Sequence, residues 1–147
     1  MNNIKYLLSA DAPANQFTKA HSADAGFDLC AAEAGSVAPG MQRAVSTGLR
    51  VSIPEGFVGL VKSRSGLAFK KGVEVGAGVV DSGYTGEVKV LLHNLCKDET
   101  YFFDKGTRIA QMVVIPIYNG CTAQVVSEDE LGTTDRGTHG FGSTGEK

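Results

Sequence analysis

The chain has 147 residues, 42% of them hydrophobic, and a formal net charge of −2. This length suits one domain that buries a core without metal or disulfide support. The small net charge gives no bulk attraction to nucleic acid or to an anionic membrane, and no apolar run approaches the ~18 residues of a membrane span. We therefore expect neither partner, and any recognition of phosphate must be local.

Three widely spaced cysteines, Cys30, Cys96 and Cys121, form no Cys-x-x-Cys pair, which argues against a structural zinc site. We expect free thiols in a reducing compartment. Residues 1–8 are typical of a short strand and lack the apolar core of a secretory signal. We expect a cytoplasmic protein, or one in the cytoplasm or nucleus of a host cell if the source is viral.

Alternation of apolar and polar residues indicates strands along most of the chain. The clearest cover residues 49–53, 56–62, 87–94 and 108–117. Val88, Val90 and Leu92 share one face of the third strand. The fourth is apolar on both faces, as in a strand buried on both sides. Turns recur every ~8–12 residues, which favours an all-β sandwich or barrel-like fold.

One short helix is expected at residues 65–71, with Ser65 as its N-cap and lysines in its last turn. Its N–H groups would lie beside Ser63 and Arg64. Guanidinium, hydroxyl and N–H donors together match phosphate oxygens. Taken alone, however, this segment is more typical of a solvated turn.

Residues 72–86 form the most informative stretch, an extended apolar run followed by a glycine-rich turn. Glycines let the main chain approach a planar ligand closely. Asp81 could activate a water, and Tyr84, three residues later, could lie against a sugar or base. Taken alone, Asp81 is more typical of a turn aspartate.

The C-terminal residues 132–147 are rich in glycine and polar side chains. They lack the Gly-Lys-Ser/Thr ending of a Walker A loop. We expect residues 1–131 to form one β-domain and residues 132–147 to form a flexible arm that closes over an active site. The alternative is a disordered C-terminus.

Five segments, taken in this order, resemble the five motifs of the trimeric dUTP pyrophosphatase (dUTPase) family. They are residues 25–29, 64–68, 78–86, 106–112 and 136–145. The resemblance spans roughly residues 20 to 145. It implies an all-β, jelly-roll-like (β-clip) subunit of a homotrimer, with dUTP bound between subunits.

The resemblance also implies hydrolysis of dUTP to dUMP and pyrophosphate, which limits uracil in DNA and supplies dUMP. Asp81 would be the catalytic base, Tyr84 would exclude a 2′-hydroxyl, and Asp28 would help to place hydrated Mg²⁺. The implied substrate-binding residues are Arg64, Ser65, Gly66, Gly78, Val79, Val80, Asp81, Tyr84, Lys89, Gln111, Arg136, Phe141, Gly142, Ser143 and Thr144.

Three departures from the family pattern are visible. Ser63 stands where proline is frequent, Gly83 where an acid is frequent, and His139 where glycine is common.

Two other functions compete with dUTP hydrolysis. A related dCTP deaminase would need a glutamate at position 91, which is a leucine here and cannot shuttle a proton. A non-catalytic binding protein is disfavoured by the intact Asp81, Tyr84 and Arg136.

Overall fold

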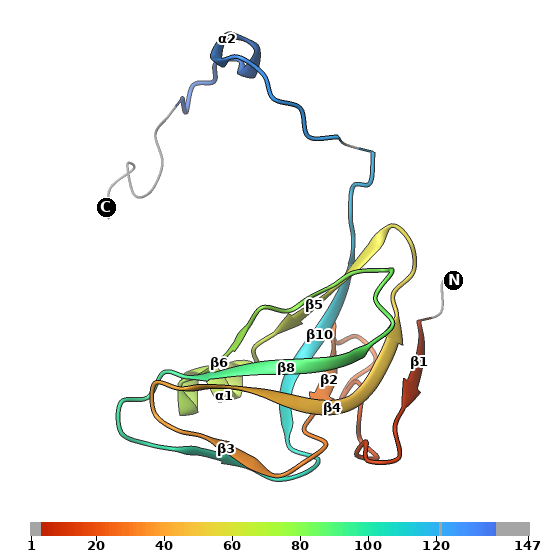
Figure 1. The fold of residues 1–147 in the computed structure, drawn as a ribbon, viewed down its shortest axis with the longest axis vertical. Coiled ribbons are helices and arrows are strands. Elements are labelled where there is room, and N and C mark those ends of the chain that lie inside the picture. Colours follow the sequence, from red (N-terminus) through yellow and green to blue (C-terminus); the bar gives the residue numbers. More distant parts are fainter. Residues whose placement is uncertain (1–3, 121, 138–147) are drawn as a thin grey trace.

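The computed structural model describes residues 4–120 and 122–137, and residues 5–116 of these form a body of antiparallel β-sheets (Figure 1). The strands are β1 Lys5–Leu8, β2 Gly26–Cys30, β3 Gly35–Val37, β4 Gln42–Ser52, β5 Phe57–Lys62, β6 Val73–Gly76, β7 Val79–Val80, β8 Glu87–Asn94, β9 Tyr101–Phe103 and β10 Arg108–Pro116. The two short helices are α1 Ser65–Lys71 and α2 Glu128–Leu131. The expectation of an all-β fold is confirmed.

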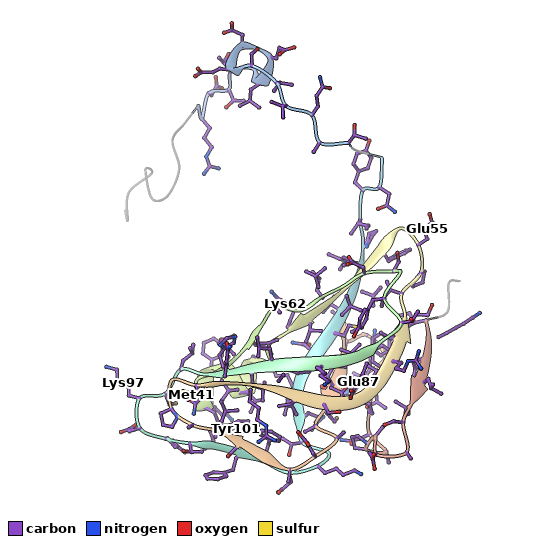
Figure 2. All side chains as sticks on the ribbon, viewed as in Figure 1. Met41, Glu55, Lys62, Glu87, Lys97 and Tyr101 are labelled. Carbon is purple, nitrogen blue, oxygen red and sulfur yellow. The ribbon has the colours of Figure 1, made fainter. Side chains whose placement is uncertain are left out.

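Two four-stranded sheets build the body. One has the order β1-β4-β8-β6 and the other the order β2-β10-β5-β7, while β3 and β9 form a separate two-stranded sheet. The side chains between the sheets form one apolar core (Figure 2). Val88, Val90 and Leu92 of β8 all belong to this core, as their alternation predicts. The core contributes the main favourable free energy of folding, because it removes apolar surface from water.

Strand β10 differs from its prediction. Ile109, Ala110 and Met112 are buried, but Val113 is only half-buried and Ile115 is 37% exposed. Val113 pairs with Leu60 of β5, and the two side chains share the outer face of the sheet. The prediction that β10 is buried on both faces is therefore wrong for the single chain.

The helices also differ in detail. The N-cap of α1 is Arg64 and not Ser65, and no side chain caps it. A second helix, α2, was not predicted. Ser127 and Glu130 form a capping box there, in which each side chain bonds the other's main chain. The Ser-x-x-Glu spacing was therefore a usable sequence signal for this helix.

The segment after β10 leaves the body and carries α2 at a distance from both sheets (Figure 1). Residues 122–137 are exposed throughout. Among the described residues, neither helix combines the length and apolarity needed to cross a bilayer.

The cysteine expectation holds for the two thiols described here, since Cys30 and Cys96 are both free. Burial raises the pKa of the Cys30 thiol to about 11, so that it stays protonated at neutral pH.

The buried amide of Gln16 ties the N-terminal loop to both sheets. Its nitrogen donates to the Cys30 carbonyl at 2.9 Å and to the Thr47 carbonyl at 2.6 Å. Its oxygen accepts from the N–H groups of Cys30 and Phe17. One side chain thus bonds three buried main-chain groups at the end of β2 and at the bulge of β4, where an unpaired group would incur a desolvation penalty, while the Phe17 N–H also donates to the Asp28 carbonyl.

We expect Gln16→Ala to lower the free energy of unfolding by about 2–4 kcal/mol, since it leaves several buried groups unsatisfied. Urea denaturation of the variant and the wild type measures this. Gln42→Ala is the matched control, because Gln42 is exposed at the start of β4. Equal losses in both variants would contradict a structural role for the buried amide.

Candidate functional site

The hairpin after β7 lines a cavity of about 670 Å³, here called the hairpin cavity. Its lining contains the predicted site residues Gly78, Val79, Val80, Asp81, Tyr84 and Lys89, together with Val61, Ala77, Glu87 and Val88. The first five come from one short stretch of the chain, residues 78–84, and Lys89 comes from β8, the next strand along the chain. The structure therefore places these six residues, which were expected to bind the base and sugar, around one cavity, whereas Phe141, expected over the base, lies outside the described residues.

Backbone conformation shapes this cavity. Gly78 has φ of 106°, and a Cβ at this position would lie 2.6 Å from the carbonyl oxygen of Val61. The Val61 N–H donates to the Gly78 carbonyl at 2.7 Å, so the two segments meet main chain to main chain. Ala77 has φ of 54°, a left-handed conformation that is unfavourable for a residue with a Cβ. Glycine at position 78 is thus required by both space and conformation.

Asp81 and Tyr84 are held by a turn. The Tyr84 N–H donates to the Asp81 carbonyl at 3.0 Å, and the Tyr84 hydroxyl donates to the Glu87 carbonyl at 2.8 Å. Both side chains are exposed to the cavity mouth. The ring is fixed at both ends, whereas the carboxylate is exposed to solvent.

Glu87 is a cavity residue that the sequence did not single out. Its carboxylate accepts hydrogen bonds from the Ser46 hydroxyl and, at 2.9 Å, from the Gly48 N–H. Burial alone would raise the pKa of Glu87, but these hydrogen bonds and the Lys89 ammonium together lower it below its ordinary value. Figure 2 labels Glu87, which begins β8 in the β1-β4-β8-β6 sheet. Glu87 stays ionised and joins β8 to the bulge of β4.

A second cavity of about 350 Å³, here called the arginine cavity, lies at the start of α1. Its lining includes the predicted residues Asp28, Arg64, Ser65, Gly66 and Gln111. Arg108 also lines it and was not among the predicted site residues. The two cavities have no lining residue in common.

Asp28 lies between two guanidinium groups. Its oxygens are 3.4 Å from Arg64 Nε and 3.3 Å from Arg108 Nη1, and its side chain is only 13% exposed. The Arg64 guanidinium also donates to the Arg108 carbonyl at 3.2 Å. Two guanidinium groups beside one carboxylate leave several N–H donors available in the cavity. This is the chemistry that binds phosphate.

A β-bulge explains why Arg108 was missed. In a regular strand, residues 108 and 111 point to opposite faces because their separation is odd. The register of β10 against β2 shifts between Arg108 and Ala110, with Ile109 as the extra residue. Arg108 and Gln111 therefore line the same cavity. Simple alternation in the sequence cannot indicate this.

Of the predicted C-terminal site residues, only Arg136 is among the described residues, and it lines neither cavity. Arg136 lies on the exposed segment beyond α2. Phe141, Gly142, Ser143 and Thr144 lie outside the described residues, as does His139. The arm's role and the boundary between domain and arm stay predictions.

The residues of the two cavities define a class, a β-sheet protein equipped to bind a phosphorylated ligand. Comparison with known proteins identifies the family. The dUTPase family profile matches residues 12–145. The deoxyuridine 5′-triphosphate nucleotidohydrolase of Corynebacterium jeikeium is 45% identical over 129 residues, which are 86% of this chain and 83% of that protein. That of Rhizobium etli is 48% identical over 127 residues, 82% of this chain and 79% of that protein.

Solved structures agree with this match. A dUTPase of Staphylococcus bacteriophage 80alpha in complex with dUpNHpp superposes with a TM-score of 0.85 and 31% identity, covering 99% of both chains. A dUTPase of phage phi11 of S. aureus, described with a structural Mg(II) ion, has a TM-score of 0.76 and 28% identity, covering 87% of this chain and 99% of that one. This chain belongs to the dUTPase family.

The glycine at position 78 generates a prediction. Gly78→Ala should lower the free energy of unfolding by roughly 2 kcal/mol or more, because the new Cβ would meet the Val61 carbonyl in an unfavourable conformation. Gly83→Ala is the control, since a Cβ there meets nothing within 4 Å. It should change stability by less than about 0.5 kcal/mol. Thermal and urea unfolding measure both, and a tolerated Gly78→Ala would contradict the close approach.

Proposed function

We propose that this chain hydrolyses dUTP to dUMP and pyrophosphate through attack of water on the α-phosphorus. The observation that carries the proposal is the arrangement of the hairpin cavity. There the exposed Asp81 carboxylate, a tethered tyrosine ring and glycine main chain surround one space. In a cell this reaction would limit uracil in DNA and supply dUMP.

The hairpin cavity would bind the nucleoside. Main-chain groups of residues 78–81 and of Lys89 would read the edge of uracil, and a methylated base would clash with the closely packed hairpin. The Tyr84 ring would pack on the deoxyribose. Its hydroxyl is already bonded to the Glu87 carbonyl, so the ring has a fixed place and leaves no room for a 2′-hydroxyl.

Asp81 would act as the general base. It would accept a proton from water while the water oxygen forms a bond to the α-phosphorus. The bond from that phosphorus to the bridging oxygen would break, and pyrophosphate would leave with the bonding electrons. Water attack at phosphorus mainly needs positioning and charge stabilisation, so one oriented carboxylate suffices on the protein's side.

The arginine cavity would bind the phosphate chain through Arg64, Ser65, Gly66 and Gln111. We add Arg108 to this set, because it lines the same cavity and its guanidinium contacts Asp28. These groups would stabilise the charge that develops on the phosphate oxygens in the transition state.

The residues present fit Mg²⁺ only in an indirect role. Within the described residues no cluster of three or more histidine, cysteine or carboxylate side chains could hold a metal ion directly. Mg²⁺ is usually held by one or two carboxylates, several waters and substrate phosphates. Asp28 would contribute through the water shell, and the ion would supply charge neutralisation on the triphosphate.

The active form would be a homotrimer with each site shared between copies. Three partly exposed apolar side chains, Val79, Leu60 and Val113, form a row across the outer face of the β2-β10-β5-β7 sheet. Gln111 of the arginine cavity lies on that same face. A second copy that covered this face would also complete the two separate cavities. The arm, residues 132–147, would then close over a shared site with Arg136, Phe141, Gly142, Ser143 and Thr144.

The first test compares four nucleotides. Purified protein with Mg²⁺ should release pyrophosphate from dUTP and hardly from dTTP, dCTP or UTP. Asp81→Asn should keep binding and lose at least ~10²-fold in kcat, because an amide cannot accept the proton. Equal rates on all four substrates would contradict base and sugar selection, and ammonia release from dCTP would indicate deamination instead.

The second test is complementation between inactive variants. Asp81→Asn removes the base of the hairpin cavity, and Arg64→Ala removes a phosphate ligand of the arginine cavity. Refolded together at equal amounts, they should recover activity at about a quarter of the sites if each site draws its two cavities from different copies of a closed ring. No recovery in trimers shown to be mixed would place both cavities of a site in one chain.

A further inference from the structure

Ser63 lies between β5 and α1, directly before Arg64, where the family often has proline. Its hydroxyl donates to the Glu74 carboxylate and accepts from the Val75 N–H at 2.9 Å. Its carbonyl accepts from the Gln111 side-chain nitrogen at 3.0 Å. One residue therefore joins the phosphate loop, strand β6 and strand β10. Ser63 and Glu74 are both half-buried and do not line the arginine cavity.

We propose that Glu74 is a positioning residue that acts through Ser63 to fix the arginine cavity in its phosphate-binding arrangement. This inference rests on the proposed function. A hydrogen bond to an ionised carboxylate is stronger than one between neutral groups, so Glu74 holds the Ser63 hydroxyl in one orientation. That orientation leaves an oxygen lone pair for the Val75 N–H.

The consequence for the cavity follows from the next residues along the chain. With Ser63 fixed, the backbone of the next residue, Arg64, has a defined position. From there its guanidinium reaches both Asp28 and the Arg108 carbonyl. Gln111 is fixed from the other side. Its amide lies so close to Gly26 that a Cβ on Gly26 would be 2.5 Å from its oxygen. The amide oxygen of Gln111 is thus confined by Gly26, and its amide nitrogen is held by the Ser63 carbonyl.

Proline at position 63 would rigidify the chain through its ring. Serine has no such restriction, and here the same rigidity comes from hydrogen bonds. Glu74 follows α1 on strand β6, so the contact closes the loop that contains the whole phosphate-binding segment. A short loop closed in this way loses little further entropy when a phosphate chain binds.

A comparable pair lies at the other cavity and provides a contrast. The Ser46 hydroxyl donates to Glu87, which lines the hairpin cavity. Both pairs join a serine to a glutamate between neighbouring segments. They differ in which half of the nucleotide they would affect.

The test compares two ligands in calorimetric titrations with Mg²⁺, namely dUMP and the non-hydrolysable analogue dUpNHpp. Ser63→Ala and Glu74→Ala should weaken dUpNHpp binding by roughly tenfold and dUMP binding by less than about twofold, because only the longer phosphate chain needs the arginine cavity. Ser63→Thr, which keeps the hydroxyl, should retain the wild-type ratio of the dissociation constants for dUMP and dUpNHpp. Ser46→Ala should affect both ligands alike, since they share base and sugar.

An unchanged ratio in Ser63→Ala and Glu74→Ala, or an equal loss for both ligands, would overturn the positioning role. If Ser63→Ala does not fold, Glu74→Gln decides. A shift of its ratio in the same direction supports the proposal, and the wild-type ratio overturns it. A wild-type chain that fails to bind both ligands and to hydrolyse dUTP would overturn the proposed function, which is a different result.

Discussion

The register of β10 between β2 and β5 is the constraint on which the arginine cavity depends. Gln111 pairs with Asp28 on one side and with Lys62 on the other. This places an amide and a carboxylate on one face and leads the chain directly into Arg64. A slip of one residue would turn Gln111 into the core and Met112 out of it. The buried side chains of β10 thus fix the position of the polar ones, and the core specifies the site through strand pairing.

The two cavities are built in different ways. The hairpin cavity depends on main-chain geometry, since Gly78 must approach Val61 and Ala77 must adopt a left-handed conformation. The arginine cavity depends on side-chain charges, with Arg64 and Arg108 both paired to Asp28. Each is held to a neighbouring segment by a glutamate that accepts a hydrogen bond from a serine hydroxyl. Preorganised groups of this kind do not have to be reordered when a ligand binds.

Local patterns in the sequence predicted what local physics decides. Alternation gave the buried face of β8, and glycine spacing placed Asp81 and Tyr84 on one turn. The extra residue at Ile109 has no local signature, so Arg108 was missed as a site residue. The half-exposed face of β10 was also missed, because Val113 and Ile115 look like core residues in sequence. Only the three-dimensional pairing shows which apolar residues lack a partner within the chain, and that the two cavities are separate.

The apolar row beside the arginine cavity links assembly to chemistry. Val79 is 67% exposed and Leu60 and Val113 are partly exposed in the single chain, and burial of such a row against another copy would be favourable in itself. Covering it would also remove water from the neighbouring ion pairs of Asp28. Electrostatic interactions strengthen as the local dielectric falls. A triphosphate bound there would then meet Arg64 and Arg108 in a drier environment than one chain provides. The apolar contact that stabilises the assembly would therefore also strengthen charge stabilisation in the site.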